Sequence, residues 1–193
     1  MFKAGASMPI TTLDPNTALI VIDLVKGIVA MPTAHPTADV VARSSALAEA
    51  FRSQHLPVVL VSVNPAVHGR ADQAPRAYNL PEGFADLVPE LNHQPEDHLV
   101  IKRNWGAFTN TGLAEYLQSK SVTQVVIVGV ATSIGVESTA RQAHELDFNV
   151  TLAIDAMTDL HLDAHNHSIA RIFPRIAETG TAQEIITLLQ ATR

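Results

Sequence analysis

The chain has 193 residues, of which 47% are hydrophobic and 17% charged, as in a globular protein with one sizeable core rather than a disordered chain. The net charge of -6, without any cluster of Lys and Arg, argues against a general nucleic-acid-binding protein. Cysteine is absent, which excludes disulfides, thiolate metal sites and a cysteine nucleophile. We therefore expect a single domain over residues 1–193.

The first residues, MFKAGASMPITTLDPN, lack the long apolar core of a signal peptide. No later apolar run approaches the roughly 18 residues that a membrane-spanning helix needs. We expect a cytoplasmic protein without a membrane partner.

Six short apolar runs rich in β-branched residues are predicted to be strands. They are residues 17–24, 56–63, 97–102, 124–130, 149–155 and 175–179. The second and fourth runs are almost continuously apolar, which is typical of strands covered on both faces.

Segments with helical spacing of apolar residues lie between these runs. They are residues 37–54, 112–120, 134–147, 163–173 and 182–191. Pro174 is expected to end the fourth helix, and Thr181 with Glu184 has capping-box spacing before the last. The alternation predicts a Rossmann-like α/β fold, a three-layer α/β/α sandwich around a central, mostly parallel six-stranded sheet.

Residues 64–96 break this alternation, with five prolines and little periodicity. A connection of this length is unusual inside a compact domain. It is either a surface excursion or a functional segment, such as a lid or a subunit contact.

Polar residues follow several of the predicted strands, at the edge where ligands bind in open parallel sheets. Asp23 closes the first strand, Lys102 the third, and the turn at 132–135 follows the fourth. We expect these three to converge on one crevice, although Asp23 alone fits a turn cap and Lys102 alone a solvated lysine. Asp155 closes the fifth strand and is expected to cap the segment that follows it.

The turn VATSIGVESTA at 130–140 leaves two further interpretations open. Ser133 is either a helix N-cap or a nucleophile, but no motif places a histidine base beside it and no G-x-S-x-G elbow is present. The glycine turn could hold a phosphate, but it lacks the Walker lysine and the G-x-G-x-x-G spacing.

The histidines of DLHLDAHNH, residues 159–167, have a spacing that can bind zinc on a helix face. His161 and His165 are four residues apart, but no third ligand is evident. We expect no metal and no cofactor.

Taken together, the residues resemble the isochorismatase-like hydrolase superfamily over nearly the whole chain. The matching pieces are VIDL with Asp23, IKRNWGAFTNTGL with Lys102, VIVGVATSIGVESTARQAHELDFNV, and DAMTD at 155–159. In most relatives an Asp–Lys–Cys triad attacks an amide or similar carbon, and the resemblance places Gly135 at the cysteine position. Isochorismatases proper also carry glycine there and use an aspartate to protonate a vinyl ether carbon.

The resemblance implies further features of the site. The catalytic positions are Asp23, Lys102 and Gly135, and the backbone of 131–135 would hold a substrate oxygen. The substrate-binding positions are Ala131, Thr132, Ser133, Ile134, Trp105 and Phe108. The last two would form a pocket wall, or else pack in the core. The resemblance also implies a non-proline cis peptide at Val130–Ala131 and a homo-oligomer, a dimer or tetramer.

Three functions remain open from the sequence. The first is a hydrolase of a small-molecule substrate, with Asp23 as general acid/base and isochorismate as the leading substrate. The second is a family member that binds a small molecule without catalysis, suggested by the absent cysteine. The third is an esterase or amidase that uses Ser133.

Overall fold

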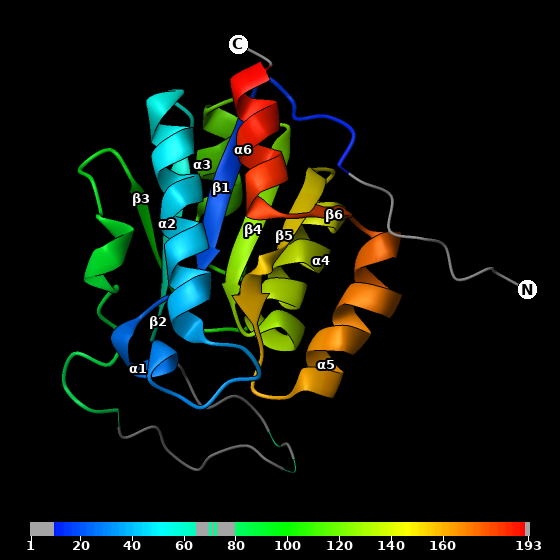
Figure 1. Cartoon of the computed structure of the whole chain (residues 1–193). Coiled ribbons are helices and arrows are strands. Elements are labelled where there is room, and N and C mark those ends of the chain that lie inside the picture. The colour runs from blue at the N-terminus through cyan, green and yellow to red at the C-terminus, as the bar shows by residue number, and fades with distance from the viewer. Residues whose placement is uncertain (1–9, 65–69, 71, 73–79, 192–193) are drawn as a thin grey trace, which may run out of the picture.

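The computed structural model describes residues 10–64, 70, 72 and 80–191. Six parallel strands form one sheet in the order β3-β2-β1-β4-β5-β6 (Figure 1). The strands are β1 (Thr17–Ile22), β2 (Val58–Val63), β3 (His98–Lys102), β4 (Gln124–Val130), β5 (Asn149–Thr158) and β6 (Glu178–Gly180). The predicted fold class is confirmed, and every strand pair is parallel rather than most of them.

Helices cover both faces of the sheet, as Figure 1 shows. Helices α2 (Thr37–Ser53) and α6 (Ala182–Ala191) lie on one face, while α3 (Leu113–Ser119) and α4 (Glu137–Glu145) lie on the other. The short helices α1 (Lys26–Val29) and α5 (Leu162–His167) complete the set. Alternate residues of β1 enter the two cores, because successive side chains of a strand point to opposite faces.

The order of the strands in the sheet indicates where a ligand-binding crevice is expected. From β1 the sheet grows outward through β2 and β3, and the chain then returns to β4 on the other side of β1. Ligands of open α/β sheets bind at such a switch point, outside the carboxyl ends of the strands. Asp23 follows β1 there and the turn at 131–135 follows β4, so the fold brings the two predicted segments together.

Two helical segments differ from the predicted ranges at their ends. The helix expected at 134–147 begins as a π-helical turn, Thr132–Val136, and continues as α4. The helix expected at 163–173 is α5, a π-helical turn over Ser168–Ile172 and a 3₁₀ turn over Phe173–Arg175. Pro174 therefore does not end the helical segment, because it lies at the start of the 3₁₀ turn, where the missing N–H is not needed.

Strand β5 corrects the interpretation of Asp155. The strand does not end at Asp155 but bulges there, since Ile127 pairs with Leu152 and Gly129 with Met157. The bulge turns the Asp155 carboxylate toward α6, where it accepts the Ala182 N–H at 2.8 Å and lies 3.3 Å from Arg43. Asp155 thus caps α6 rather than the segment that directly follows it.

The described part of the 64–96 segment is tied to the start of α1. Gly27 N–H donates to the Phe84 carbonyl, Val88 N–H donates to the Leu24 carbonyl, and Val25 forms an antiparallel bridge with Leu87. The residues most central to the predicted lid or subunit contact, 65–69, 71 and 73–79, lie outside the described residues.

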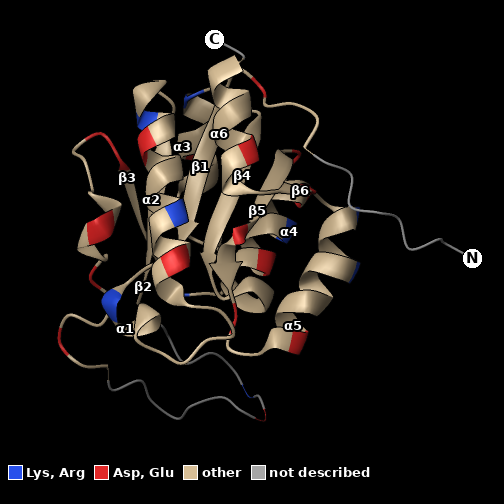
Figure 2. Cartoon of the chain, in the orientation of Figure 1, with Lys and Arg blue, Asp and Glu red and all other residues tan. Residues whose placement is uncertain are grey.

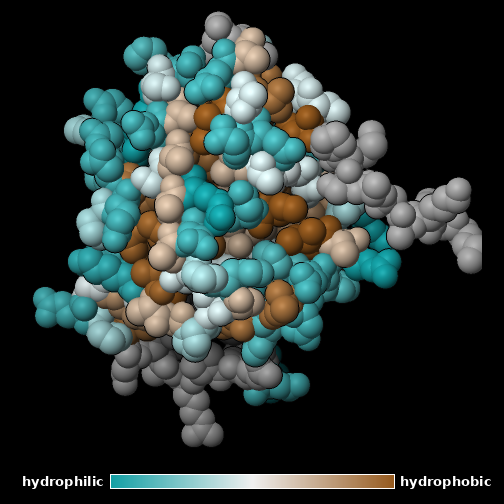
Figure 3. Space-filling view, viewed as in Figure 1, coloured by the Kyte–Doolittle hydropathy of each residue, from teal (hydrophilic) through white to brown (hydrophobic). Residues whose placement is uncertain are grey.

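The surface shows mixed chemistry on the side drawn in the figures. Figure 2 shows acidic and basic residues interspersed along the helices, and Figure 3 shows apolar side chains in separate patches between polar ones. No helix among residues 10–64 and 80–191 is both long and apolar enough to cross a membrane.

Candidate active site

Asp23 lies at the rim of the core, directly after β1. Its backbone has a φ of 53°, in the left-handed region that few non-glycine residues adopt, and this ends the strand two residues before the predicted position. The Asp23 N–H donates to the Val61 carbonyl of β2 at 3.0 Å. The residue is 5% exposed, so its carboxyl group is almost out of water.

Lys102 is the last residue of β3 and is 3% exposed. Its Nζ lies 2.8 Å from Asp23 Oδ2, across the intervening strand β2, and donates to the Asn104 carbonyl at 3.3 Å. The expected meeting of these two charges is confirmed. The exposed-lysine and turn-cap alternatives are wrong, because both side chains are buried against each other.

The Asp23 carboxyl group titrates near neutrality. Burial raises the pKa of Asp23 from 3.8 to about 6, and the Lys102 ammonium group opposes this rise through its charge and its hydrogen bond. Only Oδ2 is held by Lys102, while Oδ1 is buried without a hydrogen-bond partner among the described residues. A buried, unpaired oxygen of this kind calls for an explanation, and a proton or a bound molecule supplies one.

Gly135 lies directly against Asp23. A Cβ atom on Gly135 would lie 3.0 Å from Ile22 Cγ2 and 3.4 Å from Asp23 Oδ2. A side chain at this position would therefore point at the Asp23–Lys102 pair, as the family resemblance implies for the nucleophile. The expected cis peptide at Val130–Ala131 is confirmed.

The backbone amides of the turn are less available than we expected. Ser133 N–H donates to Asp159 Oδ2 at 2.7 Å, and Ile134 N–H donates to the Ala131 carbonyl at 3.1 Å. These two amides are used inside the protein, so the expectation that the whole turn offers them to a substrate oxygen is wrong. The carboxylate of Asp159 already occupies the N-terminal end of this helical segment.

The side chains of the turn divide into two kinds. Thr132 is fully buried and its hydroxyl is 2.8 Å from His165 Nδ1, so that hydroxyl is engaged within the protein, and a contact of Thr132 with substrate stays a prediction. Ala131, Ser133 and Ile134 are half-buried. The Ser133 hydroxyl has no histidine partner in the described part of the chain, and a carboxylate caps its amide, so neither the nucleophile nor the N-cap interpretation is supported.

The two aromatic residues near Lys102 have separate surroundings. The ring of Phe108 lies 5.9 Å from the ring of Phe148, which precedes β5, and its N–H donates to Gln142 of α4. Phe108 is half-buried and packs against the core on that face of the sheet, while its part in a pocket wall stays a prediction. Trp105 is 68% exposed, so core packing is wrong for it, and a contact with substrate stays a prediction.

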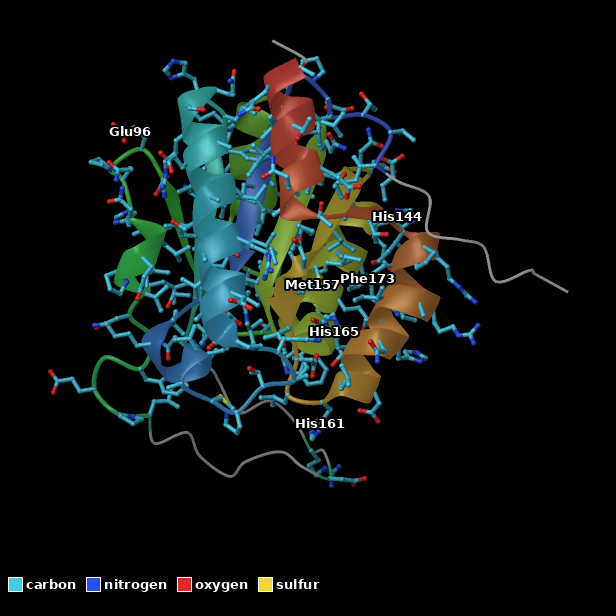
Figure 4. All side chains as sticks on the ribbon, in the orientation of Figure 1. Glu96, His144, Met157, His161, His165 and Phe173 are labelled. Carbon is cyan, nitrogen blue, oxygen red and sulfur yellow. The ribbon has the colours of Figure 1, made fainter. Side chains whose placement is uncertain are left out.

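The histidines of residues 159–167 do not share one face of a helix. His165 is 6% exposed and faces inward from α5, whereas His161 precedes the helix and is exposed (Figure 4). Among residues 10–64, 70, 72 and 80–191, no three or more side chains of His, Cys, Asp or Glu gather in a way that could hold a metal ion.

A hollow of about 860 Å³ lies away from this site. It is lined by residues around the Arg52–Asp97 ion pair, where β2 and β3 begin. The hollow lies at the amino ends of the strands, whereas Asp23 lies at their carboxyl ends. We therefore identify the candidate site by the buried Asp23–Lys102 pair and not by the size of a cavity.

The whole-chain comparison decides the family. The family model of the isochorismatase domain matches residues 17–184, from the start of β1 into α6. The chain belongs to the isochorismatase family of hydrolases.

Several relatives match about nine tenths of this isochorismatase-family chain. The uncharacterised isochorismatase family protein YecD of Escherichia coli O157:H7 is 41% identical over 181 residues, which are 90% of this chain and 96% of that one. YwoC of Bacillus subtilis, another uncharacterised isochorismatase family protein, is 35% identical over 180 residues, 89% of this chain and 93% of that one. The structure of an isochorismatase family protein from Burkholderia thailandensis has a TM-score of 0.89 and 39% identity, covering 93% of this chain and 98% of that one.

Sequence reasoning missed two residues beside the turn of this isochorismatase-family chain. The sequence marks Asp159 only as part of the DAMTD block and His165 only as a candidate metal ligand. Both hold the turn through hydrogen bonds. The signal for Asp159 was its place directly after the apolar end of β5, where a carboxylate reaches the amides of a neighbouring helical turn.

Proposed function

We propose that the protein hydrolyses a small-molecule vinyl ether of the isochorismate type, with Asp23 as the general acid and without a covalent nucleophile. The observation that carries this proposal is the state of Asp23. Its Oδ2 is held by Lys102, its Oδ1 is buried and unpaired, and its pKa is raised to about 6 by burial. A carboxyl group with a raised pKa keeps its proton to a higher pH than an ordinary aspartic acid and can deliver it inside a site with little water.

The reaction follows from that proton. Asp23 protonates the terminal methylene carbon of the enolpyruvyl group, which leaves positive charge on the ether carbon and oxygen. Water then adds to that carbon and returns a proton to the Asp23 carboxylate. The hemiketal then breaks its bond to the ether oxygen. The hemiketal hydroxyl loses its proton and becomes the ketone of pyruvate, and the ether oxygen gains a proton and leaves as the ring alcohol. The net change is the addition of one water molecule, with Asp23 unchanged.

Lys102 has a distinct role in this scheme. Its ammonium group lies 2.8 Å from Asp23 Oδ2 and stabilises the carboxylate that remains once the proton has left. Without that cation, the buried carboxylate would hold its proton more tightly. The pair therefore keeps the acid able to donate near neutral pH.

Gly135 supports a route without a nucleophile. The chain contains no cysteine at all, so the thiol route of cysteine hydrolases is not open to it. A side chain at Gly135 would begin 3.4 Å from Asp23 Oδ2, and glycine places no side-chain atom beside that carboxyl group. Ala131, Ser133, Ile134 and Trp105 are candidates for contact with the substrate.

Deuterium transfer tests the reaction class. The protein is incubated with isochorismate in D₂O, and the pyruvate that forms is analysed by mass spectrometry and NMR. Protonation on carbon places one solvent deuterium in the methyl group of pyruvate. The Asp23→Asn variant is the matched control, because the amide has nearly the same shape and no acidic proton.

Two results would contradict the proposal. One is pyruvate formation by the Asp23→Asn variant at the wild-type rate, because solvent deuterium enters the methyl group whichever acid donates it. The other is intact isochorismate after incubation, together with a raised melting temperature, which would mark a protein that only binds the compound.

A further inference from the structure

A second buried polar cluster holds the start of the Gly135 turn. Thr132 Oγ1 is 2.8 Å from His165 Nδ1, and both residues are buried, at 0% and 6% exposed. His165 reaches the turn from α5, a segment far along the chain (Figure 4). The proposed reaction does not use either group.

The surrounding contacts fix both partners in place. Asp159 is 1% exposed and its two oxygens accept the N–H groups of Ser133, at 2.7 Å, and His161, at 3.2 Å. On the other side of His165, the ring of His35 lies 4.7 Å away and is anchored by its Nδ1, 3.1 Å from the Thr158 hydroxyl. The titratable groups that face His165 are therefore His35 and Asp159.

The turn that this cluster holds lies against the acid. Gly135 is three residues after Thr132 in the same π-helical turn, and a Cβ there would be 3.4 Å from Asp23 Oδ2. Lys102 is the charged group that lowers the Asp23 pKa, against the larger effect of burial. A displacement of the turn would open the space beside the Asp23 carboxyl group without touching Lys102.

We propose that Thr132 and His165 are a positioning pair, which holds the Gly135 turn against Asp23 and keeps water away from its carboxyl group. Neither residue touches the substrate in this role. They act through the backbone of the turn. The predicted effect on turnover rests on the proposed reaction. The effect on Asp23 does not, because the Asp23 pKa can be measured without a substrate.

The pKa of Asp23 reports whether the turn still excludes water. Burial is the largest cause of the raised Asp23 pKa, so a loosened turn that admits water lowers that pKa toward 3.8. Turnover of isochorismate falls with it, by roughly 10-fold or more, because a small misplacement near the reacting atoms is costly.

The experiment compares variants that remove the hydrogen bond with variants that keep it. Thr132→Val and His165→Ala remove it. Thr132→Ser retains the hydroxyl, and His165→Asn retains a polar group near the position of Nδ1. The Asp23 pKa is measured in each full-length protein by NMR titration with ¹³C-labelled aspartate, and the Asp23→Asn variant assigns the signal.

We expect an Asp23 pKa of about 6 in the wild type, Thr132→Ser and His165→Asn, and a lower one in Thr132→Val and His165→Ala. If Thr132→Val does not fold, the two His165 variants provide the same comparison. His165→Asn also separates the hydrogen bond from the charge, because it removes the titrating ring.

Two outcomes overturn the positioning role. One is an Asp23 pKa that stays raised in Thr132→Val and His165→Ala. The other is an equal fall in Thr132→Ser and His165→Asn. Either result leaves the proposed function standing, whereas the expected pKa pattern without any cleavage of isochorismate contradicts the function and not the positioning pair.

Discussion

Lys102 Nζ lies 2.8 Å from Asp23 Oδ2, although Lys102 ends β3 and Asp23 follows β1, two strands that do not pair with each other. Strand β2 lies between them, and both side chains reach over its end into a place almost free of water. The sheet does not need this pair to form. A buried ion pair of this kind is weak evidence for stability and better evidence for a function.

Removing the cation should cost stability, because it leaves Asp23 buried without a counter-ion. We expect Lys102→Met to lower the free energy of unfolding by about 3–5 kcal/mol at pH 8. Urea unfolding provides the measurement. Lys26→Met is the control, since the Lys26–Asp86 pair is similarly close at 2.9 Å but its side chains are 56% and 58% exposed, and we expect a loss below about 1 kcal/mol. Equal losses in the two variants would contradict the account.

The pH dependence of stability should carry the signature of Asp23. Its pKa in the folded protein is about 6, above the ordinary 3.8, so the folded state binds this proton more tightly than the unfolded state. The stabilisation is complete below pH 3.8 and is lost as the pH rises through about 6. The total is on the order of 3 kcal/mol.

Asp23→Asn isolates this contribution because it cannot titrate. The difference in the free energy of unfolding between wild type and Asp23→Asn should shift against the wild type as the pH rises from about 4 to 6. Urea melts at a series of pH values measure it. A difference that moves the other way would mean that Lys102 outweighs burial.

Two glycines near Asp23 should respond differently to alanine. A Cβ on Gly129 would lie 2.0 Å from the Ile22 carbonyl oxygen, and its φ is +119°, so Gly129→Ala should destabilise by more than about 3 kcal/mol. Gly135 would place its Cβ 3.0 Å from Ile22 Cγ2, a side chain that can adjust, and we expect a change below about 1 kcal/mol.

Gly135→Ala should affect activity more than stability, the reverse of what we expect for Gly129→Ala. Gly135→Ala places a methyl group beside the Asp23 carboxyl group and should lower turnover while the protein stays folded. Thermal melts and steady-state rates measure both effects. A folded Gly135→Ala with full activity would show that the space over Gly135 does not belong to the substrate.

Two carboxylates of the β5 region offer a matched test of the helix ends. Asp159 accepts the Ser133 N–H at the site, and Asp155 accepts the Ala182 N–H at the start of α6. Each change to alanine should cost about 1–2 kcal/mol. Only Asp159→Ala should also lower the turnover of isochorismate, and a loss of activity in Asp155→Ala as large as that would contradict the assignment.

The sequence predicted the parts of the site that depend on strand order. Asp23 and Lys102 were placed together because both follow apolar runs, and the carboxyl ends of parallel strands meet at one edge of the sheet. Gly135 was placed by the resemblance to the family. The resemblance also placed Ser133 and Ile134 in this turn as substrate-binding positions, and both are half-buried.

The parts that failed depend on contacts between distant side chains. Periodicity gives no sign that Thr132 bonds His165, or that Asp159 takes the Ser133 amide. The apolar run of β5 predicts a strand that ends at Asp155, but the strand bulges there and continues. Pro174 predicts the end of a helix, but it lies within a 3₁₀ turn. Phe108 reads as a neighbour of Lys102 in the sequence, but the loop turns its ring toward Phe148.

The turnover of isochorismate by the Asp23→Asn variant tests the central claim most directly. Loss of a general acid should lower the rate by roughly 10²–10⁴-fold, in a protein that remains folded because the amide keeps the shape of the buried group. Unchanged turnover in the folded variant would remove Asp23 from the mechanism and contradict the account.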